Sequence, residues 1–253
     1  MRRLSIEEAG DSILEIGKRM YSHGLVVATD GNLSVRISED RILVTPTGMN
    51  KGMLSRSDLV VTNLKGERIG GSREPTSEIK MHIRAYELRD DIQAVVHAHP
   101  PYATAFAVAG IALEECVLPE IIVSIGSVPL AEYATPATEE MPRSIEEVVK
   151  HCDAFLLRNH GVMTVGRDLL EAYHKLEMVE HLAKITFIAM QLGGPRPLSV
   201  EDVKKLYSLR EPGGTGPYPG CRLPGLENKT VEEQVLVRLI AEEVSRILKE
   251  GSR

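Results

Sequence analysis

The chain contains 253 residues, of which 43% are hydrophobic and 26% charged, and its formal net charge is −6. A chain of this length and apolar content can bury one substantial core, so we expect a single folded domain over residues 1–253. An acidic balance without a cluster of basic residues argues against a protein that binds the nucleic-acid backbone.

The first residues lack the apolar centre of a secretory signal, and no later run is apolar for long enough to cross a bilayer. We therefore expect a cytoplasmic protein that does not bind membranes. The three cysteines, Cys116, Cys152 and Cys221, lie far apart in the sequence, and we expect all three to be reduced.

The first third of the chain predicts one helix followed by antiparallel strands. Apolar residues at helical spacing, with acidic residues early and basic residues late, predict a helix over 5–22. Short apolar or alternating runs separated by turn residues then predict strands. These are LVVA at 25–28, LSVRI at 33–37, ILV at 42–44, and a hairpin around Lys65 and Gly66.

From Thr76 onward, helices and strands alternate. The predicted order is a helix starting near Ser77, the strand AVVHAH at 94–99, a proline-initiated helix at 100–110, a strand pair over 153–166 and a long helix over 169–194. Glycine and proline then dominate a predicted loop near 211–229, and a capping box precedes a predicted amphipathic helix at 230–250.

Three histidines stand at the ends of predicted strands. His97 and His99 are two residues apart, so on a strand both imidazoles can face the same side, and two prolines follow them at once. His160 follows another apolar strand and precedes a glycine. Three neutral imidazoles suit Zn²⁺ or a similar divalent ion. The pair alone could equally be one exposed and one core-packed histidine.

Glu78 could supply an oxygen ligand or a base, because it lies near the start of a predicted helix, where free N–H groups favour an anion. By itself, a carboxylate at this position could equally act only as a helix cap.

Five blocks, GNLSVR, TPTG, PTSE, HAHP and RNHG, occur in that order. Together they resemble the signature blocks of the class II aldolase and adducin family, typified by a zinc-dependent L-fuculose-1-phosphate aldolase. The resemblance implies an α/β fold, a three-layer α/β/α arrangement with a largely antiparallel central sheet, which the strand-rich first half permits. It also implies a homotetramer with sites at subunit interfaces.

The resemblance further implies a site. His97, His99 and His160 match the family's metal ligands, and Glu78 matches the glutamate that binds the metal and moves a proton. The expected cofactor is Zn²⁺, with Mn²⁺ or Co²⁺ as alternatives. Small hydroxyl, amide and glycine groups would hold a substrate phosphate without an arginine or lysine; the matching positions are Gly31, Asn32, Thr47, Gly48, Thr76 and Ser77. Each of these could also be ordinary turn or cap chemistry.

The reaction expected from the resemblance is an aldehyde-lyase reaction. A ketose 1-phosphate, such as L-fuculose 1-phosphate, would be cleaved to dihydroxyacetone phosphate and an aldehyde through a metal-stabilised enediolate. A metal-dependent decarboxylase, dehydratase or 4-epimerase acting on a sugar phosphate or sugar acid remains an alternative. A non-catalytic adducin-like module is a further one, although the full ligand set argues against it.

One position departs from the family pattern. The aldolases carry a catalytic tyrosine where Val123 stands here, so its role is vacant or has moved. Candidates are Tyr133, Tyr207, Tyr218 and Glu120, the last either as a buried carboxylate or as a helix-terminal residue. The other five histidines are expected to be structural or exposed; they are His23, His82, His151, His174 and His181.

Overall fold

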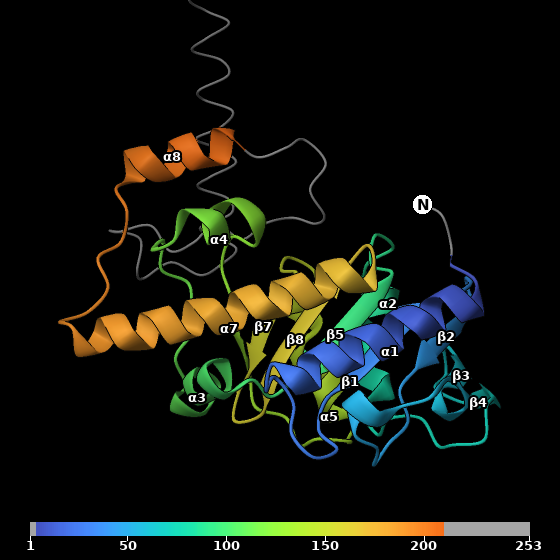
Figure 1. Ribbon diagram of the computed structural model, residues 1–253. Helices are drawn as coiled ribbons and strands as arrows, with labels where there is room; N and C mark the ends of the chain where they lie inside the picture. The colour runs from blue at the N-terminus through green and yellow to red at the C-terminus, as the bar shows by residue number, and fades with distance from the viewer. Residues whose placement is uncertain (1–3, 210–253) are drawn as a thin grey trace, which may run out of the picture.

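The computed structural model describes residues 4–209, and within this part of the chain eight strands form one sheet (Figure 1). Their order is β4-β3-β2-β1-β5-β8-β7-β6. Every neighbouring pair is antiparallel except β6 and β7, which run parallel. The strands are β1 (Asn32–Arg36), β2 (Arg41–Val44), β3 (Val60–Asn63), β4 (Arg68–Gly70), β5 (Ala94–Ala98), β6 (Leu130–Ala131), β7 (Ala154–Leu157) and β8 (Gly161–Gly166).

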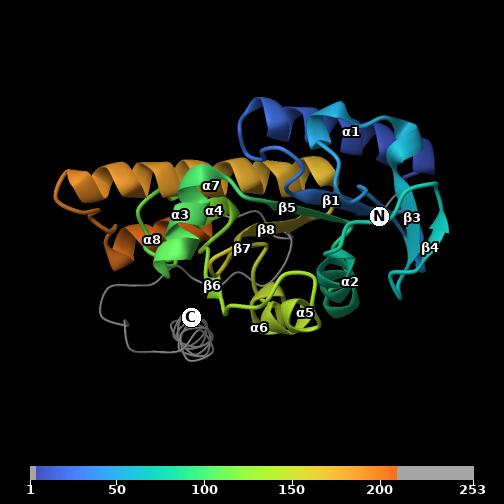
Figure 2. The ribbon, with the colours of Figure 1, turned by 90° about the horizontal axis from the view of Figure 1, so that it is seen from below.

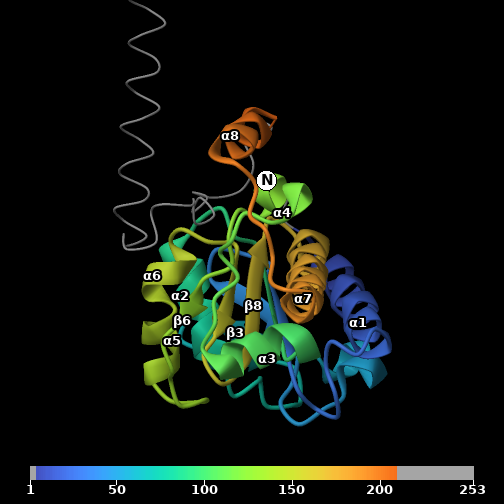
Figure 3. The same ribbon diagram turned by 90° about the vertical axis from the view of Figure 1, so that its left-hand side faces the viewer.

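Helices cover both faces of this sheet. Figures 2 and 3 show α1 and α7 on one face and α2, α5 and α6 on the other. Each face has its own hydrophobic core, because residues of one strand alternate between the two: Val96 packs toward α1 and α7, and Val95 packs toward α2. The helices are α1 (Ile6–Ser22), α2 (Ile79–Leu88), α3 (Pro101–Ala109), α4 (Pro119–Ser124), α5 (Glu140–Ser144), α6 (Glu146–Val149), α7 (Leu169–Gln191) and α8 (Val200–Ser208), with 3₁₀ turns η1 (Lys51–Met53) and η2 (Arg56–Asp58).

The predicted three-layer α/β/α arrangement with a largely antiparallel sheet is therefore confirmed. The helix predicted over 5–22 is α1, which begins with a capping box at Ser5 and Glu8. The hairpin around Lys65 and Gly66 is β3–β4. The loop near 211–229 and the helix at 230–250 lie outside the described residues, so the single-domain prediction for the whole chain stays a prediction.

Two predictions from local sequence are wrong. The run LVVA is a turn, in which Leu25 and Val26 pack into the core and Ala28 has a left-handed backbone with φ of 47°. An apolar run of this length satisfies burial equally well in a loop. Cys116 takes part in a disulfide, whereas Cys152 is free and buried. Sequence spacing gave no sign of that contact, and Cys221 lies outside the described residues.

Among residues 4–209, no helix has both the length and the apolar character that a membrane span requires.

The pairing of β5 determines what gathers at its carboxyl end. Strand β1 pairs with β5 so that Asn32 lies opposite His97, and β8 pairs with β5 on its other side so that Met163 lies opposite the same histidine. Gly31 allows this close packing. Its φ is +73°, and a Cβ atom there would lie 2.6 Å from Val26 Cγ1 and 2.8 Å from the His97 carbonyl oxygen.

Replacing Gly31 should therefore cost more than replacing a glycine that has only an unusual φ. Gly24 is the matched control, because its φ is +69° and no atom lies within 4 Å of a Cβ built there. Gly24→Ala should lower the unfolding free energy by about 1 kcal/mol, the left-handed backbone cost alone. Gly31→Ala should cost about 2 kcal/mol more, because the added methyl group overpacks the turn. Urea denaturation measures both, and equal losses would contradict the proposed close packing.

Candidate metal centre and anion-binding loops

Three imidazoles meet at the carboxyl end of β5. His97 is the penultimate residue of that strand, His99 follows it directly, and His160 lies in the turn between β7 and β8. Their ring centroids are 4.7 to 4.9 Å apart, and one nitrogen of each lies within 4.8 Å of the others. The Nε2 atoms of His97 and His99 are 3.0 Å apart. The structure thus brings together the three histidines singled out in the sequence.

The second nitrogen of each ring determines whether the first can bind a cation. His97 donates its Nδ1–H to the carbonyl of Val162 at 2.9 Å, which leaves the Nε2 lone pair free for a ligand. The Nδ1 of His99 lies 3.5 Å from the Asp30 carboxylate. Burial lowers the pKa of His97 and of His160, so both rings are held neutral, as metal ligands must be.

Glu78 completes the group as the N-cap residue of α2. Its Oε2 lies 3.3 Å from His97 Nε2, and its Oε1 lies 3.3 Å from His160 Nε2. Oε1 is buried and has no hydrogen-bond donor among the described residues. The carboxylate thus faces His97 with one oxygen and His160 with the other, and a buried carboxylate oxygen without a donor leaves room for a cation between them. Three imidazole nitrogens and one carboxylate oxygen are a donor set that fits Zn²⁺ and similar divalent ions.

A buried row of hydrogen bonds supports Glu78 from behind. The Asn32 amide donates to Glu78 Oε2 at 2.8 Å and accepts from His82 Nε2 at 2.5 Å. His82 Nδ1 in turn lies 2.7 Å from Ser34 Oγ, which lies 2.8 Å from the Tyr86 hydroxyl. His82, Ser34 and Tyr86 are each no more than 1% exposed. We call these five residues the polar row.

Only one direction of donation satisfies the polar row. Because Asn32 donates to a carboxylate, its carbonyl oxygen faces His82, and His82 must carry its proton on Nε2. Nδ1 is then an acceptor for the Ser34 hydroxyl, and the Tyr86 hydroxyl donates to Ser34, whose Oγ lies at 2.8 Å and whose carbonyl oxygen lies at 3.1 Å. Burial lowers the pKa of His82 to about 4, which keeps the ring neutral in this tautomer. The row therefore fixes the Asn32 amide with its N–H groups toward the site.

Three loops lie around this centre. Pro46 and Pro75 form an isolated β-bridge, reinforced by hydrogen bonds from the Thr47 N–H to the Glu74 carbonyl and from the Thr76 N–H to the Thr45 carbonyl. These bonds hold TPTG against PTSE, and the Asn32 amide joins both to the GNLS turn through Glu78. Within residues 4–209 the N–H groups of Gly48 and Ser77 have no backbone partner. Both residues are exposed, so the donors are open to an anion.

A cavity of about 240 Å³ opens beside Glu78. The start of α2 lines one side, with Thr76 and Ser77, and the segment 137–142 lines the other. Lys80 and Glu139 form an ion pair across its rim. The segment 137–142 was not singled out from the sequence.

The candidates for the missing tyrosine lie in different surroundings. Tyr133 is 56% exposed, Tyr207 packs with Cys116 beside α4 and α8, and Tyr218 lies outside the described residues. Glu120 is exposed in the first turn of α4. The alternative of a helix-terminal residue is therefore confirmed, and the alternative of a buried carboxylate is wrong. Val123 is half-buried on α4.

Sequence reasoning missed two contributors. Of the two alternatives for His82, structural or exposed, the structural one holds, but its hydrogen bond to Asn32 beside the site was not foreseen. A signal existed: Glu78, His82 and Tyr86 are four residues apart on a helix, and Asn32 and Ser34 are two apart on a strand, so each set shares a face. Asp30, beside His99, gave no such signal.

His82 should make the protein acid-sensitive. Its pKa is about 4 in the folded protein against 6.5 for an ordinary histidine, so the unfolded chain binds the proton first and stability falls as pH drops from 6.5 toward 4. His82→Gln can donate to Asn32 and accept from Ser34. Its free energy of unfolding should therefore decrease by about 3 kcal/mol less than that of the parent over this pH range. Denaturant titrations between about pH 7 and about pH 4 measure this. His174→Gln, on the exposed face of α7, is the control, and identical losses in parent and His82→Gln would contradict the assignment.

Known proteins are similar to this chain in sequence and in fold. Residues 11–187 match the model of the class II aldolase and adducin N-terminal domain. The chain is 35% identical to an L-fuculose phosphate aldolase of Methanococcus maripaludis, over 71% of this chain and 96% of the relative. It is 33% identical to a 3-oxo-tetronate 4-phosphate decarboxylase of Haemophilus influenzae, over 77% and 93%. A solved L-fuculose 1-phosphate aldolase superposes with a TM-score of 0.75 at 34% identity, covering 81% of this chain and 97% of that one. The chain therefore belongs to the class II aldolase and adducin family.

Proposed function

We propose that this protein is a divalent-metal-dependent aldolase that cleaves a ketose 1-phosphate, such as L-fuculose 1-phosphate, to dihydroxyacetone phosphate and an aldehyde. The observation that carries the proposal is the convergence of His97, His99, His160 and Glu78 at one end of the sheet. A binding module has no structural need for three converging imidazoles and a buried carboxylate oxygen that lacks a donor among the described residues. The lyases among the relatives support the reaction class.

In this proposal His97, His99, His160 and Glu78 hold the ion, Zn²⁺ in the first instance, with Mn²⁺ or Co²⁺ as alternatives. The bound ion would supply Lewis-acid stabilisation of negative charge on substrate oxygens. Glu78 would take and return the proton on the carbon next to the ketone, because its buried Oε1 has no hydrogen-bond donor among the described residues and is free to accept a proton. The Asn32 N–H, fixed by the polar row, keeps Glu78 aimed into the site.

The phosphate of the substrate is assigned to the three loops around Glu78. Its proposed partners are Gly31, Asn32, Thr47, Gly48, Thr76 and Ser77. Support comes from the bonds that hold TPTG against PTSE and from the open N–H groups of Gly48 and Ser77. Several N–H donors converging on one anion need no direct cation contact.

The decarboxylase relative supports a second candidate reaction, in which a 3-oxo acid phosphate would lose carbon dioxide at the same proposed metal centre. Both reactions leave negative charge on a carbon next to a carbonyl group, so the same residues would serve either. A homotetramer with sites at subunit interfaces stays a prediction. So does the cytoplasmic location, which the disulfide at Cys116 does not support, because disulfides are rare in a reducing compartment.

The metal assignment predicts that His97→Ala loses its ion. Removal of one ligand from a buried site should weaken metal binding by at least about 100-fold, more than loss of a supporting hydrogen bond would. Elemental analysis after dialysis measures this, with about one ion per chain expected in the parent. His181→Ala, on the exposed face of α7, is the control. A His97→Ala variant that keeps the parent's metal content would contradict the ligand set.

The aldolase assignment predicts proton exchange on one half of the reaction. In deuterated water, the metal-loaded parent should exchange a carbon-bound proton of dihydroxyacetone phosphate for deuterium. Proton NMR measures the rate of this exchange. Glu78→Gln should slow this exchange by about 100-fold or more, because it removes the base. Metal content is measured on the same sample, because Glu78 is also a proposed ligand. No exchange in the metal-loaded parent, together with release of carbon dioxide from a 3-oxo acid phosphate, would favour the decarboxylase.

A further inference from the structure

Lys51 is a buried lysine that the metal centre does not use. It begins the 3₁₀ turn η1 and its residue surface is only 2% exposed. The ammonium group donates to the carbonyl of Thr29 at 2.7 Å and to the carbonyl of Met49 at 2.6 Å. Lysine side chains are almost never this buried without a charged partner.

No such partner is present in the described part of the chain. No carboxylate among residues 4–209 forms an ion pair with Lys51, whereas the other buried lysine, Lys175, contacts both Asp153 and Glu171. Burial lowers the pKa of Lys51 to about 8, although the negative charges of Asp30 and Glu78 oppose that shift. The side chain is therefore still mostly an ammonium ion at neutral pH, with a positive charge that contacts only carbonyl oxygens.

The two carbonyls belong to two of the three anion-binding loops. Thr29 lies two residues before Gly31 in the GNLS turn, and Met49 directly follows Gly48 in TPTG. Lys51 thus crosslinks these loops from behind. A Cβ atom built on Gly48 meets no atom within 4 Å, so the TPTG loop is open at that residue. An anion bound by the Gly48 N–H would lie one residue along the chain from the Met49 carbonyl, which the buried ammonium group contacts.

We propose that Lys51 is the buried cation of the phosphate subsite, a positioning residue that fixes the two loops and supplies the positive charge that a phosphate monoester dianion requires. The proposal rests on the proposed function, which assigns the phosphate to these loops. It departs from the expectation that no lysine is required to hold the phosphate. Coulomb attraction acts through the weakly polarisable loop rather than through water, so a dianion is favoured over a neutral or singly charged group.

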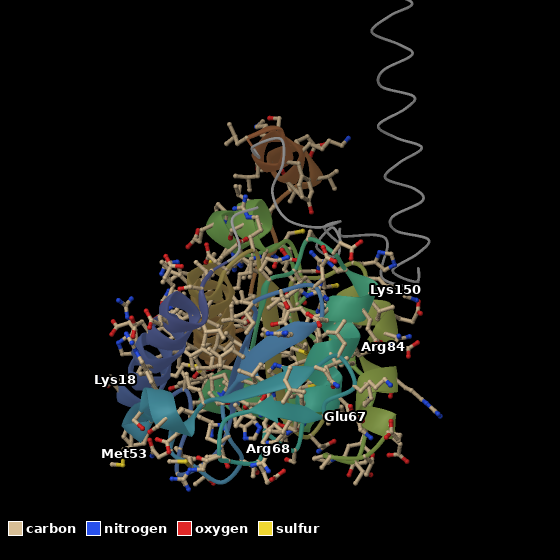
Figure 4. All side chains as sticks on the ribbon, turned by 90° about the vertical axis from the view of Figure 1, so that its right-hand side faces the viewer. Lys18, Met53, Glu67, Arg68, Arg84 and Lys150 are labelled. Atoms are coloured by element: carbon tan, nitrogen blue, oxygen red, sulfur yellow. The ribbon has the colours of Figure 1, made fainter. Side chains whose placement is uncertain are left out.

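The test separates the charge of Lys51 from its hydrogen bonds. Lys51→Gln keeps two N–H donors for the two carbonyls but removes the charge, and Lys51→Met removes both. Lys18→Gln is the control for losing one positive charge, because Lys18 lies exposed on the outer face of α1 (Figure 4). Circular dichroism checks folding, and isothermal titration with inorganic phosphate measures affinity without any turnover.

Both Lys51 variants should bind inorganic phosphate at least about tenfold more weakly than the parent, whereas Lys18→Gln should stay within about twofold. Parent-like phosphate affinity in Lys51→Gln would overturn the proposal and leave Lys51 a loop crosslink only. Absence of measurable phosphate binding in the parent would overturn it as well. Should Lys51→Gln fail to fold, Lys51→Met, which buries an apolar chain of similar length, is measured instead, and parent-like phosphate affinity in that variant would overturn the proposal.

Deuterium exchange distinguishes this proposal from the proposed function. Lys51→Gln should raise the KM for dihydroxyacetone phosphate with little change in kcat, and should leave exchange into dihydroxyacetone, which has no phosphate, at the parent rate. Equal losses with both compounds would indicate general damage to the site and overturn the charge role. A metal-loaded parent that exchanges neither compound, yet binds phosphate through Lys51, would refute the aldolase reaction and leave this proposal standing.

Discussion

The register of β5 against its two neighbours is the constraint on which the site depends. β5 lies between β1 and β8, and antiparallel pairing on both sides places Asn32 and Met163 opposite His97. Because side chains alternate along a strand, a slip of one residue would turn His97 and His99 toward α1 and α7 and away from Glu78. Apolar residues prevent the slip: Val95 belongs to the core under α2, and Val96 belongs to the core under α7. The packing of these apolar residues therefore determines that His97 and His99 face Glu78.

The hydrogen bonds of the polar row can form because one helical repeat of four residues and one strand repeat of two residues are nearly equal in length. Four residues of a helix rise about 6 Å and two residues of a strand rise about 6.6 Å, so groups on α2 and β1 can meet at each step. Glu78, His82 and Tyr86 follow the first repeat, and Asn32 and Ser34 follow the second. Buried polar groups are tolerated only when they are hydrogen-bonded, and this match supplies the partners.

Sequence reasoning was most successful where chemistry and local pattern agreed. The three histidines stand at strand ends in the sequence and meet in the structure, and the antiparallel sheet follows from the short alternating runs between turns. It failed where the outcome depended on burial. The sequence left His82 as either structural or exposed, and Lys51 looks like a surface residue of a loop, whereas the fold encloses both side chains. LVVA failed for the converse reason, since burial alone does not make an apolar run a strand.

The aldolase and decarboxylase relatives are almost equally similar to this chain, at 35% and 33% identity. That near equality is understandable if what the relatives share is the set of residues on β1, β5 and α2 and in the turn between β7 and β8. What distinguishes two substrates must then contact their other end. Across the cavity from Glu78, Ala137 and Thr138 lie in a segment that belongs neither to the sheet nor to the histidine cluster. Ala137 has φ of +61°, a left-handed backbone that is costly for a residue with a side chain. A cavity wall that lies outside both the sheet and the histidine cluster can differ in shape without disturbing the residues that the sheet brings together.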